Sequence, residues 1–136
     1  MSGPLNKESL LTFFANPPKL AYFADRGYAA ISTAWLKEFH TYFKGELWRK
    51  DLSYSKTYDC DNFARGFCAD ANEVHKEVSK GEALAIAEFH YRQDTGGYHA
   101  IIAAITEQGL VFMEPQNGDF LTLSQGEIDS CIFLRF

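Results

Sequence analysis

The segment ALAIAEFHYRQDTGGYHAIIAAITEQGLVFME, residues 83–114, decides the fold expected for this chain. Apolar residues recur in it with a period of two, which is typical of β-strands with alternating faces. Polar stretches that contain glycine separate residues 83–91, 98–106 and 110–114, and such stretches are typical of turns. Each of these three runs is therefore a predicted strand. Two more strands are expected near the end of the chain, over residues 120–123 and 131–135.

The residues before this segment have the pattern of helices. Residues 9–15 form a short apolar run that Asn16-Pro17-Pro18 should end, because the residue before a proline disfavours helical geometry. Residues 28–43 carry aromatic side chains at helical spacing, which predicts a helix that Gly45 ends. Residues 48–57 are polar and predict a loop.

A third helix is expected to begin near Cys60, with Asp59 or Thr57 as its cap and Gly81 after its end. Helices followed by a meander of strands indicate the α+β class. We therefore expect N-terminal helices packed on a mostly antiparallel β-sheet.

Length and composition are those of an ordinary globular domain. The chain has 136 residues, of which 46% are hydrophobic, so we expect a single folded domain over residues 1–136. A net charge of -5 provides no electrostatic footprint for nucleic acid. No apolar run reaches the roughly 20 residues that span a bilayer, and the start does not resemble a signal peptide. We expect a cytoplasmic protein without membrane contact, whose three cysteines are reduced.

Cys60 carries the strongest indication of chemistry. It lies at the expected start of a helix, where the partial positive charge favours a thiolate. Its spacing to Phe63 and Phe67 places it on the helix face that should pack on the sheet. The neighbouring Asp59 and Asp61 would raise the thiol pKa by like-charge repulsion, which weakens a purely catalytic interpretation and indicates a bound cation. The alternative is a buried, inert cysteine.

His99 opens an otherwise apolar strand, where a polar side chain needs a partner. A two-residue turn to the next strand pairs odd positions with even ones, so His99 should share a face with Glu114 and Gln116. An imidazole between a thiol and a carboxylate is the arrangement that a cysteine nucleophile requires. The expected triad is Cys60 as nucleophile, His99 as base and Glu114 as orienting acid. The alternative is a histidine bonded to a backbone carbonyl.

Three strings resemble the papain-like C-terminal domain of Marasmius-type fungal agglutinins: Tyr58-Asp59-Cys60-Asp61-Asn62-Phe63-Ala64, Tyr98-His99-Ala100 and Glu114-Pro115-Gln116-Asn117-Gly118. The order of cysteine, histidine and glutamate also resembles the wider papain-like and transglutaminase-like cysteine hydrolases. Related small domains occur as bacterial and phage proteins. The resemblance covers about residues 54–136 and implies a papain-like fold.

The resemblance implies a calcium-dependent cysteine hydrolase, a thiol protease that acts on a peptide or protein substrate. By that likeness the triad would again be Cys60, His99 and Glu114. Carboxylate and amide oxygens suit calcium, or manganese as the alternative. The metal ligands would be Asp61, Asn62, Gln116 and Asn117, with Asp119 as a further candidate. For Asn117-Gly118 the alternative is a plain hairpin turn.

Two other functions remain open. One is a catalytically silent papain-like binding or inhibitor module, for instance of phage origin. Small size and several aromatic residues that could form a partner surface favour it: Tyr22, Phe23, Tyr28, Trp48 and Tyr54. The other is a transition-metal site of Cys60, His90 and His99, although their spacing matches no recognised ligand pattern. His90 is also the main rival of His99, whereas His40 and His75 have the pattern of ordinary surface or boundary residues.

Overall fold

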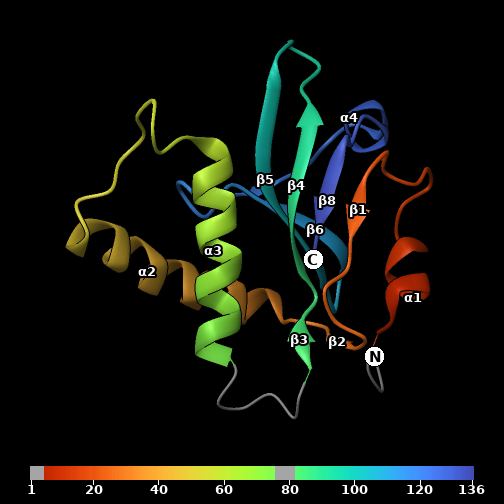
Figure 1. Cartoon of the computed structure of the whole chain (residues 1–136), viewed down its shortest axis with the longest axis horizontal. Coiled ribbons are helices and arrows are strands. Elements are labelled where there is room, and N and C mark those ends of the chain that lie inside the picture. The colour runs from red at the N-terminus through yellow and green to blue at the C-terminus, as the bar shows by residue number, and fades with distance from the viewer. Residues whose placement is uncertain (1–4, 76–81) are drawn as a thin grey trace.

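The computed structural model describes residues 5–75 and 82–136 (Figure 1). Its helices are α1 (Lys7–Leu11), α2 (Thr33–Arg49), α3 (Cys60–His75) and α4 (Gln125–Asp129). Its strands are β1 (Ala21–Tyr22), β2 (Tyr28–Ala29), β3 (Ala83–Leu84), β4 (Ile86–Arg92), β5 (Tyr98–Thr106), β6 (Gly109–Met113), β7 (Phe120–Leu121) and β8 (Phe133–Arg135).

A six-stranded sheet with the order β1-β8-β4-β5-β6-β7 forms the centre of the molecule. Only β1 and β8 pair in parallel within it, and the other neighbours are antiparallel. The small β2–β3 sheet is parallel. As Figure 1 shows, α2 and α3 lie on one side of the sheet and α1 lies on the other. The expected α+β class, with helices packed on a mostly antiparallel sheet, is confirmed.

The alternation of β5 separates two buried layers. Ala100, Ile102 and Ala104 pack against α2 and α3 in one core cluster. Ile101 and Ala103 belong to a second cluster, with the residues after α1 and with α4. Helix α3 contributes Phe63, Phe67 and Ala71 to the first cluster, because these residues recur every three to four positions along one helical stripe.

Two predicted boundaries are wrong. Helix α2 begins at Thr33 rather than near Tyr28, because the side chain of Ser32 caps it by accepting the N–H of Trp35. Tyr28 instead begins β2. The helix also continues through Gly45 to Arg49, because one glycine costs a helix only about 1 kcal/mol and the buried Phe43 and Leu47 continue its apolar stripe. Trp48 therefore belongs to a helix and not to a loop.

The other strands and helices show smaller differences. The predicted strand over residues 83–91 is divided at Ala85, whose N–H donates to Ala29 of the small sheet at 2.7 Å. The strand expected over residues 131–135 is observed only as β8, over Phe133–Arg135, and α4 precedes it. Ser124 and Glu127 form a capping box at the start of α4, a signal that the sequence contains. Helix α3 begins at Cys60 as expected, and the predicted end at Gly81 lies outside the described residues.

Helix α1 is also displaced from its predicted position. It spans Lys7–Leu11 rather than residues 9–15, because Asn6 and Ser9 form a capping box at its start. Within the described parts of the chain, no helix combines the length and the apolar character needed to cross a membrane.

Candidate functional site

A pocket lies where the first turn of α3 meets β4 and β5. Its volume is about 220 Å³, and the residues that line it are Cys60, Asp61, His90, Tyr98, His99, Ala100 and Ile132. Helix α3 supplies the thiol and a carboxylate, and the two strands supply both imidazoles. Tyr98 is 65% exposed at the start of β5. The structure therefore brings Cys60, His90 and His99 to the same hollow, from one helix and two strands.

The environment of Cys60 holds its thiol in the protonated form. Burial is the largest cause that raises the pKa of Cys60 above its ordinary value of 9.0, and the negative charges of Asp59 and Asp61 raise it further. A hydrogen bond from the backbone of Ala100 opposes them only in part. At neutral pH the group is a thiol, so the helix N-terminus does not decide its state.

His99 and Glu114 form the closest polar contact of this region. The Nε2–H of His99 donates to Oε1 of Glu114 at 2.6 Å, and both side chains are mostly buried. The contact follows from the β5–β6 register, in which Ala103 pairs with Phe112 and Ile105 with Leu110. This is the expected pairing of odd with even positions. The structure therefore joins His99 and Glu114 on one face, as predicted.

Cys60 and His99 are neighbours without being bonded. No hydrogen bond connects the Cys60 thiol to the His99 ring among residues 5–75 and 82–136. His99 belongs to the same row of β5 as Ile101, whereas α3 packs on the row of Ala100. Its ring lies 6.2 Å from that of Tyr91, the residue that it faces on β4. Because Nε2 is bound to Glu114, Nδ1 is the ring nitrogen left for another partner.

His90 is the imidazole on the face that α3 covers. It pairs with Ala100 on one side and with Phe133 on the other. Its Nε2 is buried without a hydrogen-bond partner and lies 3.6 Å from Oε1 of Glu88. The face of His90 was uncertain from the sequence, because it depended on the geometry of residues 93–97.

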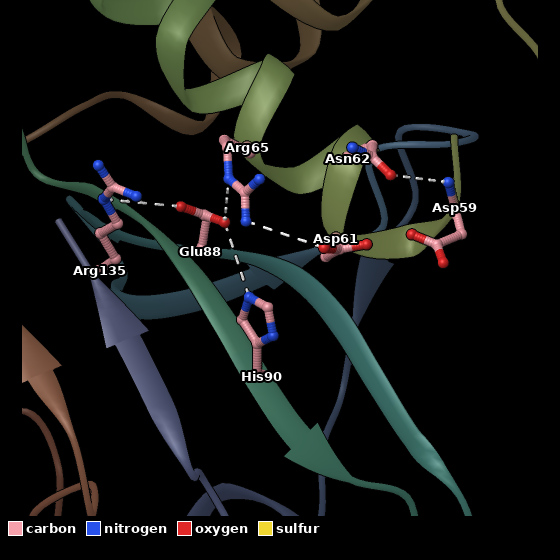
Figure 2. A network of polar contacts seen from close by, with 7 residues as sticks. All are labelled: Asp59, Asp61, Asn62, Arg65, Glu88, His90 and Arg135. Atoms are coloured by element: carbon pink, nitrogen blue, oxygen red, sulfur yellow. Dashed lines mark hydrogen bonds and ion pairs between the residues drawn. The ribbon is translucent and has the colours of Figure 1, made fainter. Parts of the chain in front are cut away.

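Figure 2 shows a charge network around Glu88 that connects with the pocket. Glu88 lies in the middle of β4 and is only 2% exposed. Nε of Arg65 lies 3.4 Å from Oε1, and Nε of Arg135 lies 4.0 Å from Oε2. Arg65 also approaches Asp61 of the pocket at 3.8 Å. Glu88 is not among the predicted site residues, although a charged residue within an apolar strand is itself a signal of buried partners.

Helix α2 holds the loop that carries Glu114. His40 is 6% exposed, and its Nε2 donates to the carbonyl of Pro115 at 2.8 Å. Lys37 donates to the carbonyl of Gly118 at 2.7 Å. Burial is the main cause that lowers the pKa of His40 below 6.5, so the ring is neutral at neutral pH. The prediction that His40 is an ordinary surface or boundary residue is wrong, because its buried ring binds the loop that carries Glu114.

The residues predicted to bind calcium make other contacts. Oδ1 of Asn62 accepts the N–H of Asp59 at 3.1 Å, and Oδ1 of Asn117 accepts the N–H of Asp119 at 2.9 Å. The N–H of Gln116 donates to Glu114 at 3.4 Å. Each amide oxygen keeps a second lone pair, so these contacts leave the calcium site a prediction.

One acidic pair lies close to the predicted calcium ligands. Oδ1 of Asp59 is buried without a partner. A hydrogen bond with Asp61 is the main cause that raises the pKa of Asp59 and lowers that of Asp61. Over the described part of the chain, no group of three or more His, Cys, Asp or Glu residues is placed to hold a metal ion. The transition-metal site of Cys60, His90 and His99 is therefore not formed.

Comparisons with known proteins identify similar structures but no similar sequence family. No protein-family model and no curated protein matches the chain. Polyporus squamosus lectin, bound to the human-type influenza-binding epitope Neu5Aca2-6Galb1-4GlcNAc, superposes with a TM-score of 0.68 and 20% identity, over 93% of this chain and 45% of that one. A complex of PSL1a with E64 superposes with a TM-score of 0.76 and 19% identity, over 98% of this chain and 50% of that one.

These comparisons correct the predicted classification as a hydrolase and thiol protease, which is wrong. One of the matching structures is described as a lectin, and neither is described as a protease. In the site, burial raises the pKa of the Cys60 thiol, and no hydrogen bond joins this thiol to His99. The chain spans about half the length of the solved chains that it matches, and identities this low show the fold alone. The expected likeness to a fungal agglutinin is thus confirmed only at this level: the chain has the fold of part of the Polyporus squamosus lectin.

Proposed function

We propose that this chain is a ligand-binding module whose site is the pocket of Cys60, His90, Tyr98 and His99. One observation carries this proposal: polar side chains from α3, β4 and β5 line the same pocket, which has a volume of about 220 Å³. The absence of a hydrogen bond between Cys60 and His99, in the region that the structure describes, supports binding without turnover. The lectin fold supports the same conclusion.

The pocket offers two kinds of contact to a ligand. Asp61 and the imidazoles supply hydrogen-bonding groups, which give orientation and specificity. Tyr98 supplies an exposed aromatic ring at the rim, a side chain that contributes large contact area at low entropic cost. The volume suits one residue-sized or ring-sized group of a larger ligand. The predicted peptide or protein partner is one such ligand, and a glycan is another.

The test uses the two ligands named with the similar structures, the sialylated trisaccharide and E64. Binding is measured by isothermal titration calorimetry on the wild type, on Tyr98→Ala and on Tyr54→Ala. Tyr54 is a matched control, because it is 62% exposed but lies outside the pocket. Binding to at least one ligand that Tyr98→Ala weakens about tenfold, and that Tyr54→Ala leaves unchanged, is the expected result. If neither ligand binds at millimolar concentration, this function is rejected.

A second candidate function is nucleophilic chemistry at Cys60, with His99 and Glu114 in the roles predicted for them. The contact that favours it is the 2.6 Å hydrogen bond between His99 and Glu114. This bond orients the ring and leaves Nδ1 to accept a proton, once a ligand draws the thiol and the imidazole together. Covalent labelling distinguishes the two candidates.

In the labelling experiment the protein is incubated with E64 and with iodoacetamide, and modified cysteines are located by mass spectrometry. Binding without chemistry predicts no E64 adduct and no faster alkylation of Cys60 than of Cys68 or Cys131. The nucleophilic candidate predicts preferential modification of Cys60 that Glu114→Gln slows. Cys68 and Cys131 are suitable references, because burial also raises their thiol pKa values.

Calcium binding beside the pocket is a separate proposal. Asp61 and Asn62 of α3, together with Gln116 and Asn117 of the loop after β6, would supply the oxygen ligands. The buried, unpartnered oxygen of Asp59 supports a cation here, because a positive ion would relieve the crowding of two adjacent carboxylates. Calcium, and to a smaller extent manganese, should raise the melting temperature, and Asn62→Ala should abolish the rise. An unchanged melting temperature in millimolar calcium would reject the site.

A further inference from the structure

The sheet face that α3 covers continues beyond that helix. Glu88 faces α3, as its contact with Arg65 shows, and it pairs with Arg135 of β8. Arg135 pairs in turn with Tyr22 of β1. Because paired residues on neighbouring strands share a face, these side chains project on the same side of the sheet. In Figure 1, β8 and β1 lie on the side of β4 away from α3.

An aromatic pocket lies on this part of the molecule. Its volume is about 470 Å³, and its lining residues are Tyr22, Phe23, Ala24, Phe133, Arg135 and Phe136. The ring centroids of Tyr22 and Phe133 are 5.7 Å apart, and those of Phe23 and Phe136 are 5.5 Å apart. A mostly apolar hollow of a few hundred Å³ with one charged group is typical of small-molecule sites. It shares no residue with the pocket of Cys60.

Two positive side chains lie beside this aromatic pocket, although the chain as a whole has a net charge of -5. Arg135 is the one charged residue of the described lining, and its side chain is 56% exposed. Its Nε lies 4.0 Å from Oε2 of Glu88, an ion pair that Figure 2 draws as a dashed line and whose length exceeds that of a hydrogen bond. Nζ of Lys7 lies 5.8 Å from the ring centroid of Phe23. Two cations therefore flank an apolar hollow.

We propose that this aromatic pocket binds a small amphipathic carboxylate, a free acid with an apolar chain. The apolar chain of the ligand would pack among the four aromatic rings of the lining, where it is removed from water. The carboxylate would accept hydrogen bonds from the Arg135 guanidinium, whose planar donors match the two carboxylate oxygens. Lys7 would add attraction at longer range. An amine of the same length would meet two like charges, and a neutral alcohol would bring no negative charge to Arg135 beyond that of Glu88.

The test compares decanoate, decanol and decylamine, each below its aggregation concentration, by titration calorimetry on the full chain. Decanoate should bind about tenfold more tightly than decanol, as expected for one charge-assisted contact, and decylamine should bind most weakly. Arg135→Gln should remove the advantage of decanoate and leave decanol unchanged. Tyr22→Ser should weaken the binding of decanoate and decanol together.

Controls separate binding from folding. Arg49→Gln removes another exposed, ion-paired arginine, which belongs to α2 and lies outside this pocket, so it should not change the binding of the three probes. Arg135→Lys keeps the charge and should retain part of the preference for decanoate. Lys7 is not an ion-pair partner of Glu88. Lys7→Gln therefore tests the charge preference even if Arg135→Gln lowers the melting temperature. The proposal is overturned if decanoate and decanol bind equally, if both Arg135→Gln and Lys7→Gln leave the preference intact, or if none of the three probes binds.

Discussion

Two connections on the sheet contain a glycine in the same backbone conformation but in opposite surroundings. Gly97 precedes His99 in the turn between β4 and β5, and its φ is 83°. Gly118 follows Glu114 in the loop between β6 and β7, and its φ is 79°. A Cβ atom added to Gly97 would meet nothing within 4 Å, whereas one added to Gly118 would lie 2.5 Å from Nδ1 of His40. The first turn is local, and the second is held by a distant helix.

The difference identifies the loop on which the pocket depends. Glu114 reaches His99 from a loop whose carbonyls are bound by His40 and Lys37 of α2. The position of Glu114, and through it the orientation of His99, thus depends on residues about eighty positions earlier in the chain. The turn before His99 is exposed over residues 94–97, so it does little to hold the His99 ring in place.

The largest expected effect is that of Gly118→Ala. The substitution strains a left-handed residue and drives a methyl group into the His40 ring, so we expect a loss of about 2–4 kcal/mol in the free energy of unfolding. Urea denaturation measures the loss, and heteronuclear NMR of the His99 ring should show a changed environment. A stability within about 0.5 kcal/mol of the wild type would mean that the loop is not held by His40.

The next effect is that of His40→Ala. It removes a buried ring and leaves the carbonyl of Pro115 without its donor, for a loss of about 2 kcal/mol in the free energy of unfolding. The same NMR signal of His99 should shift as it does in Gly118→Ala. His75→Ala, which removes a partly exposed histidine from α3, is the control and should leave the His99 signal unchanged.

A smaller effect is expected for Gly97→Ala. Its left-handed conformation opposes a side chain, but open space surrounds the added methyl group, so the loss should be about 1 kcal/mol. Equal losses of stability for Gly97→Ala and Gly118→Ala, measured by the same denaturation, would contradict the difference inferred between the two connections.

The smallest effect is a dependence of stability on pH. Burial lowers the pKa of His40 in the folded state below its ordinary value of 6.5, so the unfolded chain binds the proton more readily. The contribution of His40 is therefore complete above pH 6.5 and is lost as the pH falls through the lower folded value. His40→Gln, which can still donate to Pro115, should lose less stability than the wild type between pH 7.5 and pH 5. Urea midpoints at both pH values test this, and identical losses would contradict it.

Local patterns predicted much of the fold and one contact of the site. The two-residue turn at Glu107 and Gln108 sets the β5–β6 register, and parity then joins His99 to Glu114. Helix α3 begins at Cys60 as its spacing indicates. The start of α2 was placed wrongly, because the aromatic spacing of residues 28–43 continues across a short strand and a cap.

The sequence by itself determined the alternation of the strands, the start of α3 and the register that puts His99 and Glu114 on one face, because each depends on residues within one turn or one hairpin. Only the tertiary structure decided the protonated state of the Cys60 thiol, the contact between His40 and Pro115, and the burial of Glu88 between two arginines. These features depend on how far packing removes a group from water and on which distant side chain it meets. Neither quantity is contained in a local pattern of residues.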